Sequence, residues 1–105
     1  MAQRCLWELG TGVAFHAPEV FQDRNPHNLM RDFDDEVPGY LLNDKIAQIL
    51  EATDLNAGSE HVSDNLHRCY EALIKNEILP AKEMLLVETW ISDLNNIATQ
   101  NSKNV

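Results

Sequence analysis

Basic residues are scarce in this sequence, which has 8 Lys and Arg against 17 Asp and Glu and a formal net charge of −9. The imbalance is concentrated in residues 32–93, which hold fourteen of the acidic residues and only four basic ones. Such a surface repels nucleic acid and anionic membranes and attracts basic partners. The charge therefore argues against nucleic-acid binding and membrane-surface binding as main functions.

Cysteine is also scarce, since Cys5 and Cys69 are the only two and lie 64 positions apart. This spacing fits neither a disulfide framework nor a zinc motif. We expect two reduced, partly buried thiols in a cytoplasmic protein.

Long apolar runs are missing as well, because no stretch approaches the ~20 residues that span a bilayer. Residues 1–8 lack the apolar region of a secretory signal, so we expect none. The 105 residues, 44% of them hydrophobic, suffice for one globular domain with its own core. We therefore expect residues 1–105 to form a single domain.

Catalytic motifs are absent from the sequence. It has no Gly-x-Ser-x-Gly, no glycine-rich phosphate loop and no His-Glu-x-x-His, and Gly10-x-Gly12 is too short to count. Cys69 falls on an apolar helix face, which is typical of an inert core thiol. We expect no enzyme and no catalytic, cofactor or metal site.

Apolar spacing predicts a mainly α fold with three principal helices near 40–54, 60–77 and 81–99. Pro38, Gly58 and Pro80 mark the breaks between them. Three amphipathic helices with short links predict an antiparallel bundle over 39–99. The predicted core consists of Leu42, Ile46, Ile49, Leu66, Cys69, Leu73, Val87, Ile91 and Leu94.

Residues 1–38 are punctuated by glycine and proline and predict an irregular segment. Residues 5–17 allow a short β-hairpin, or one helical turn followed by a loop. Pro18 and Pro26 could each begin a short helix, the second capped by Asn25. Residues 32–36 then form a charged connection. Because this segment is rich in aromatics that need burial, we expect it to pack across the bundle. At the other end of the chain, we expect residues 100–105 to be a frayed tail.

Four polar residues follow one another at helical spacing, namely Glu60, Asp64, His67 and Glu71. A carboxylate-x-x-histidine pair occurs in the metal sites of helical bundles, but those ligands point inward. This row lies opposite the apolar stripe, so we interpret it as a solvated face.

The charge pattern favours a non-enzymatic protein that binds, and inhibits or regulates, a basic protein partner. The expected binding residues are Asp32, Asp34, Asp35, Glu36, Glu60, Asp64 and Glu71. A helix-turn-helix transcriptional regulator is the first alternative, although residues 60–74 offer only one base, Arg68, for phosphate contacts. A structural subunit of a larger complex is the second.

The helix near 81–99 carries more apolar residues than one packing face needs. Leu85, Leu86 and Trp90 lie beside its main seam. Exposed apolar surface of this kind marks association sites, so we expect a homodimer through this helix.

We predict that Leu73→Ala and Ile91→Ala each lower the free energy of unfolding by about 2–5 kcal/mol, the usual range for truncating a large core side chain. Chemical denaturation measures this loss. An unchanged midpoint for Ile91→Ala would mean that the faces of the last helix are assigned wrongly.

Overall fold

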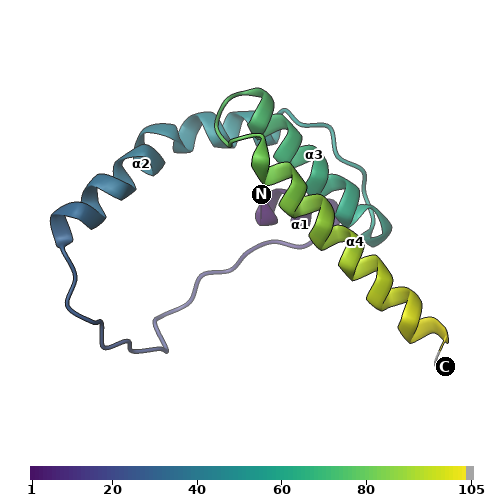
Figure 1. Ribbon diagram of the computed structural model, residues 1–105, viewed down its shortest axis with the longest axis horizontal. Coiled ribbons are helices and arrows are strands. Elements are labelled where there is room, and N and C mark those ends of the chain that lie inside the picture. Colours follow the sequence, from purple (N-terminus) through teal and green to yellow (C-terminus); the bar gives the residue numbers. More distant parts are fainter. Residues whose placement is uncertain (104–105) are drawn as a thin grey trace.

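A computed structural model describes residues 1–103, with side chains through residue 100, and this part of the chain is mainly helical without a strand. It has four α-helices and one 3-10 turn (Figure 1): α1 Ala2–Glu8, α2 Leu29–Glu51, η1 Ser59–His61, α3 Val62–Lys75 and α4 Lys82–Lys103. The predicted mainly α fold, a small helical bundle, is confirmed.

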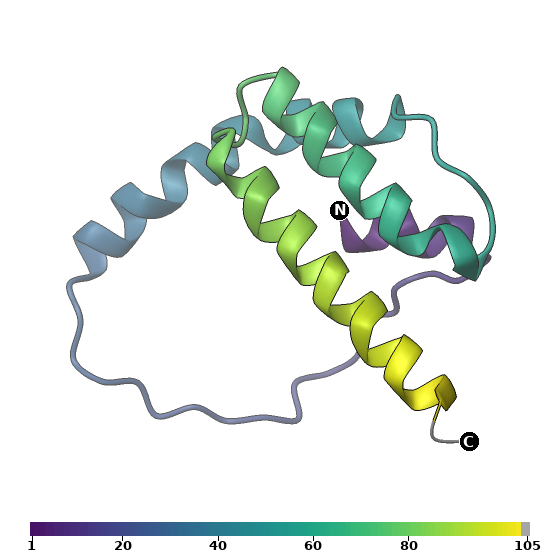
Figure 2. The same ribbon diagram turned by 45° about the vertical axis from the view of Figure 1, so that its right-hand side comes forward.

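Helix α3 is the centre of the bundle, because α1, α2 and α4 all contact it (Figure 2). The buried cluster joins Cys5 of α1, Leu50 of α2, and Cys69 and Leu73 of α3. Val87 of α4 is buried as well. Cys69 and Leu73 of α3 therefore join α1 and α2 in one buried cluster.

The predicted core is correct at its centre and wrong at its edge. Cys69, Leu73 and Val87 are buried. Five others are only half-buried: Leu42, Ile46, Ile49, Leu66 and Ile91. Leu94 is 41% exposed on α4.

The predicted β-hairpin over 5–17 is wrong, since residues 2–8 form helix α1. Arg4 and Glu8 pair across one helical turn, which supports the helix. The chain leaves it through Gly10 at φ 70°, a left-handed conformation that glycine adopts without strain. The alternative of one helical turn followed by a loop lies closer to the structure.

Helix α2 begins eleven residues before the predicted helix at 40. Its N-cap is Asn28 rather than Asn25, and the Asn28 Oδ1 accepts from the backbone N–H groups of Met30 at 3.1 Å and Arg31 at 3.3 Å. Residues 32–36, predicted as a connection, therefore lie inside a helix. No helix begins at Pro18 or Pro26.

Pro38 lies inside α2 instead of marking its start. A proline in a helix interior removes one backbone hydrogen bond and bends the helix. Figures 1 and 2 show α2 bending partway along its length. The proline therefore changes the direction of α2 without ending it.

The expected packing of residues 1–38 across the bundle holds only for α1. Every residue from 9 to 31 is exposed, including Phe15 at 94% and Phe21 at 90%. The connection from α1 to α2 runs as an extended loop away from the helices (Figure 1). The packing prediction is wrong here because this loop contains no helix or strand that could present its aromatics to the core.

The C-terminal end differs from the predicted frayed tail at 100–105. Helix α4 continues through Lys103, and residues 104 and 105 lie outside the described residues. Leu85, Leu86 and Trp90 are exposed on α4, and the homodimer through this helix stays a prediction.

The most buried polar side chain is Asn65 of α3, which sequence spacing did not single out. Its Oδ1 accepts from the Asn56 backbone N–H at 2.9 Å, and its Nδ2 donates to the Asn56 carbonyl at 2.8 Å. This pair of bonds fixes the loop between α2 and α3 against the start of α3.

We predict that Asn65→Ala lowers the free energy of unfolding by about 2–4 kcal/mol, because it leaves both Asn56 backbone groups without their partners. Asn95→Ala, on the exposed part of α4, is the matched control and should change stability by less than about 0.5 kcal/mol. Urea denaturation compares the two variants. Equal losses would contradict a structural role for the Asn65 amide.

Candidate functional site

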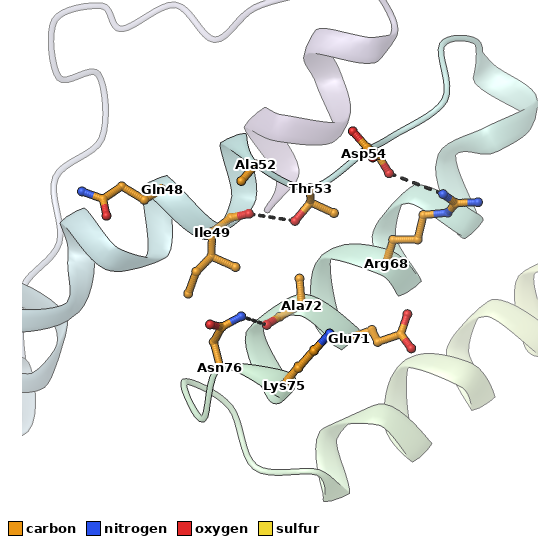
Figure 3. Close-up of a pocket in the computed structure, with 10 residues that line it drawn as sticks. All are labelled: Gln48, Ile49, Ala52, Thr53, Asp54, Arg68, Glu71, Ala72, Lys75 and Asn76. Atoms are coloured by element: carbon orange, nitrogen blue, oxygen red, sulfur yellow. Dashed lines mark hydrogen bonds between the residues drawn. The ribbon is translucent and has the colours of Figure 1, made fainter.

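A groove runs between the C-terminal half of α2 and one side of α3 (Figure 3). Its volume is about 660 Å³ and it is open to solvent. The lining residues come from both helices and from the residues just after each helix: Gln48, Ile49, Ala52, Thr53, Asp54, Arg68, Glu71, Ala72, Lys75 and Asn76.

The α3 side of the groove follows directly from helical spacing. Arg68, Glu71, Ala72 and Lys75 stand at intervals of three, one and three residues, so they share one face of the helix. The neighbouring face carries Cys69 and Leu73 into the core. Burial of these two residues thus turns the charged face of α3 toward α2.

Arg68 is fixed at one end of the groove. Its Nε donates to Asp64 Oδ2 at 2.8 Å, and its Nη1 donates to the Asp54 carbonyl at 3.4 Å (Figure 3). The guanidinium therefore links α3 to the loop that follows α2.

The polar side chains at the helix ends satisfy the backbone there. Asn76 Nδ2 donates to the Ala72 carbonyl at 2.8 Å, and Thr53 Oγ1 donates to the Ile49 carbonyl at 2.8 Å. Figure 3 shows Ala72 on the side of α3 that faces Ile49 of α2, with the Glu71 carboxylate extending from the other side of α3. The groove thus combines charged, amide and hydroxyl groups with a small apolar surface.

Arg4 of α1 positions the α2 wall of the groove. Its Nε donates to the Leu50 carbonyl at 3.0 Å and its Nη2 to the Thr53 carbonyl at 3.1 Å. These carbonyls belong to the last turn of α2 and to the second residue after it, where backbone acceptors lack helical partners. A cation at a helix C-terminus also complements the helix dipole.

The acidic residues predicted to bind a partner lie in two separate places. Asp32, Asp34, Asp35 and Glu36 lie on the N-terminal part of α2, which both ribbon views show pointing away from α3. Glu60 lies in η1, while Asp64 and Glu71 lie on α3. The structure therefore does not bring the two groups side by side, and their binding role stays a prediction.

The polar row on α3 is only partly the solvated face that we expected. His67 turns toward α4, where its Nε2 lies 3.3 Å from Glu88 Oε1. Among the described residues, no three His, Cys, Asp or Glu side chains lie close enough together to hold a metal ion.

Sequence reasoning missed most of the groove, including Arg68, Lys75, Gln48 and Asn76. The spacing of Arg68 and Lys75 on α3 was a usable signal, but the partner helix was not known. The position of α2 against α3 depends on Leu50 and on Arg4, which no local pattern connects.

The model of the STELLO glycosyltransferases matches residues 1–105. The chain belongs to this family. Searches among curated proteins and among solved structures found no match.

Membership in the STELLO glycosyltransferase family overturns the function predicted from charge. The prediction of a non-enzymatic inhibitor or regulator of a basic partner is wrong, and so are its alternatives, a helix-turn-helix regulator and a structural subunit. The expectation of no enzyme is contradicted as well, because the family match points to an enzyme-related protein. Net charge reports which surfaces attract one another, and it carries no information about the reaction that a family performs.

Within the described part of this STELLO-family chain, no helix is both long enough and apolar enough to span a membrane.

One titratable group in the core has a strongly shifted pKa. Burial, the charge of the neighbouring Cys5 and a side-chain hydrogen bond with Cys5 together raise the pKa of Cys69 from 9.0 to about 11. The amino terminus and Arg4 act in the opposite direction and do not outweigh these effects. The Cys69 thiol therefore stays protonated at neutral pH.

We predict that the free energy of unfolding falls between pH 9 and 11. Above pH 9 the exposed Cys69 thiol of the unfolded chain loses its proton, whereas the folded chain keeps its proton up to a pKa of about 11. In this range the folded state binds more protons than the unfolded state. The free energy of unfolding therefore decreases by up to about 1 kcal/mol for each pH unit.

The measurement is urea denaturation at several pH values for the wild type and for Cys69→Ala. Lys and Tyr residues titrate in both proteins, so the difference between the two slopes isolates Cys69. Parallel slopes would contradict a raised Cys69 pKa.

Proposed function

We propose that this chain takes part in glycosyl transfer and that the groove between α2 and α3 binds a neutral carbohydrate. The observation that carries this proposal is the family match over residues 1–105. The composition of the groove supports its assignment to a sugar. The reaction itself is attributed to the family, and no described residue is assigned a catalytic role.

The groups in the groove suit a ligand with many hydroxyls. The Glu71 carboxylate accepts hydrogen bonds from sugar hydroxyls, and the Lys75 ammonium donates to them. The amides of Gln48 and Asn76 do both. Methyl groups of Ile49 and Ala52 offer an apolar surface for the C–H face of a sugar ring.

The charge of the groove favours a neutral sugar over an activated sugar donor. Arg68 and Lys75 are balanced by Asp54 and Glu71 among the lining residues. A nucleoside diphosphate carries negative charge and needs net positive charge or a metal to hold it. A groove without net charge, in a chain of net charge −9, provides no such attraction.

We predict that Glu71→Gln and Lys75→Met each weaken sugar binding about tenfold or more, as the loss of a charged hydrogen bond implies. The probes are neutral disaccharides of several linkages and UDP-glucose, titrated against the chain and followed by NMR chemical shifts. The matched controls, Glu88→Gln and Lys82→Met on α4, remove the same charges outside the groove.

Binding of a disaccharide with shifts at groove residues, lost in the groove variants and kept in the controls, supports the assignment. Equal weakening by the control variants would show that only overall charge matters. Tighter binding of UDP-glucose than of every disaccharide would overturn the neutral-sugar assignment. If no disaccharide binds, the groove is not a carbohydrate site.

A further inference from the structure

Helices α1 and α3 bring the two cysteines of the chain into one buried cluster. Cys5 is 7% exposed and Cys69 is 0% exposed, and both pack with Leu50 and Leu73. We expected two reduced, partly buried thiols; both are in fact buried, and residues 64 positions apart in sequence meet in the core. Both are free thiols in this structure.

The two thiols are direct neighbours within that cluster. The Cys5 side chain is close enough to Cys69 to raise the pKa of its thiol. Helix α1 contacts α3, and both ribbon views place the two helices side by side. A disulfide forms without a large backbone movement where two cysteines lie on elements in contact and their Cα atoms are close.

We propose that Cys5 and Cys69 form a reversible disulfide that fastens α1 to α3. The oxidant is a small-molecule disulfide such as oxidised glutathione. The Cys5 thiolate attacks one sulfur of glutathione disulfide, and a glutathione thiolate leaves and takes up the proton that Cys5 released. The Cys69 sulfur then displaces the second glutathione and gives up its proton to it. Two protein thiols are oxidised and one glutathione disulfide is reduced to two thiols.

The order of these steps follows from burial. Cys69 is fully buried, and its raised pKa keeps it in the thiol form. Cys5 lies on a helix of seven residues whose N-cap makes no side-chain hydrogen bond. A helix this short is marginal by itself, so local opening of α1 exposes Cys5 first.

The bond would add a covalent link to the contacts that fix α1, which include the backbone bond from the Gly58 N–H to the Glu8 carbonyl at 3.1 Å. The exposed loop of residues 11–28 connects it to α2 and contributes no packing. A disulfide closes the long loop between residues 5 and 69, which removes conformational freedom from the unfolded chain. Holding α1 in place also holds Arg4 on the Leu50 and Thr53 carbonyls at the end of α2. This device does not depend on what the groove binds.

The test refolds the reduced, denatured chain in buffers of varied glutathione redox ratio, so that burial cannot block exchange. Samples are quenched in acid and alkylated in denaturant, and the internal disulfide is quantified by intact mass and by peptide mapping. The same titration in guanidinium gives the reference for an unfolded chain. A matched control is Cys5→Ser with Gln3→Cys, which moves the thiol to an exposed position two residues away on α1.

We predict that the equilibrium constant for the internal disulfide is at least about tenfold larger in the folded wild type than in guanidinium, and larger than in the control. By linkage, the disulfide then favours folding by the same factor and raises the thermal midpoint. Cys5→Ser should show no such redox dependence. Equal constants in folded and unfolded chains, or glutathione adducts in place of the Cys5–Cys69 bond, would overturn the proposal.

Discussion

The structure depends on packing α3 among three other helices. Cys69 and Leu73 lie at the centre of this contact, with Leu50 from α2 and Cys5 from α1. The fully buried Asn65 fixes how α3 begins, because its amide pairs with both backbone groups of Asn56. Leaving the buried Asn65 amide without partners would cost more free energy than its hydrogen bonds contribute. The α2–α3 loop therefore adopts a conformation that supplies these partners.

The same burial decides where charge is displayed. With the apolar side of α3 inward, Arg68, Glu71 and Lys75 turn toward α2 and line the groove. His67 turns toward α4 and meets Glu88. The row of polar residues on α3 is thus divided between two neighbouring helices, and the groove acquires balanced charges within a chain of strongly acidic composition.

Charge served poorly as a guide to function here. An acidic body favours a basic partner in any family, and the match to the STELLO glycosyltransferases came from a pattern spread over residues 1–105. The groove carries amides and a hydroxyl beside its charges, and the carbohydrate assignment rests on that mixture. Helical spacing places some of these residues on one face of α3, and the position of α2 against α3 brings all of them into one groove.

Local patterns in the sequence determined the three helical regions, because apolar residues at helical spacing must face a common core. They also identified Cys69, Leu73 and Val87 as core residues. The local effect of Pro38 was judged wrongly. The residue predicts a break, yet α2 begins ten residues earlier at its Asn28 cap, continues through Pro38 and bends instead of ending.

Only the tertiary structure decided what lies between distant segments. It placed Cys5 and Cys69, which are 64 positions apart, in one buried cluster. It also placed the Arg4 guanidinium on the carbonyl of Leu50, which is 46 positions away. It left residues 9–31 exposed despite their aromatics, because no element there offers a face to the core. Sequence periodicity reports which side of each helix is apolar, whereas the choice of partner for that side depends on shape and hydrogen bonding across the whole chain.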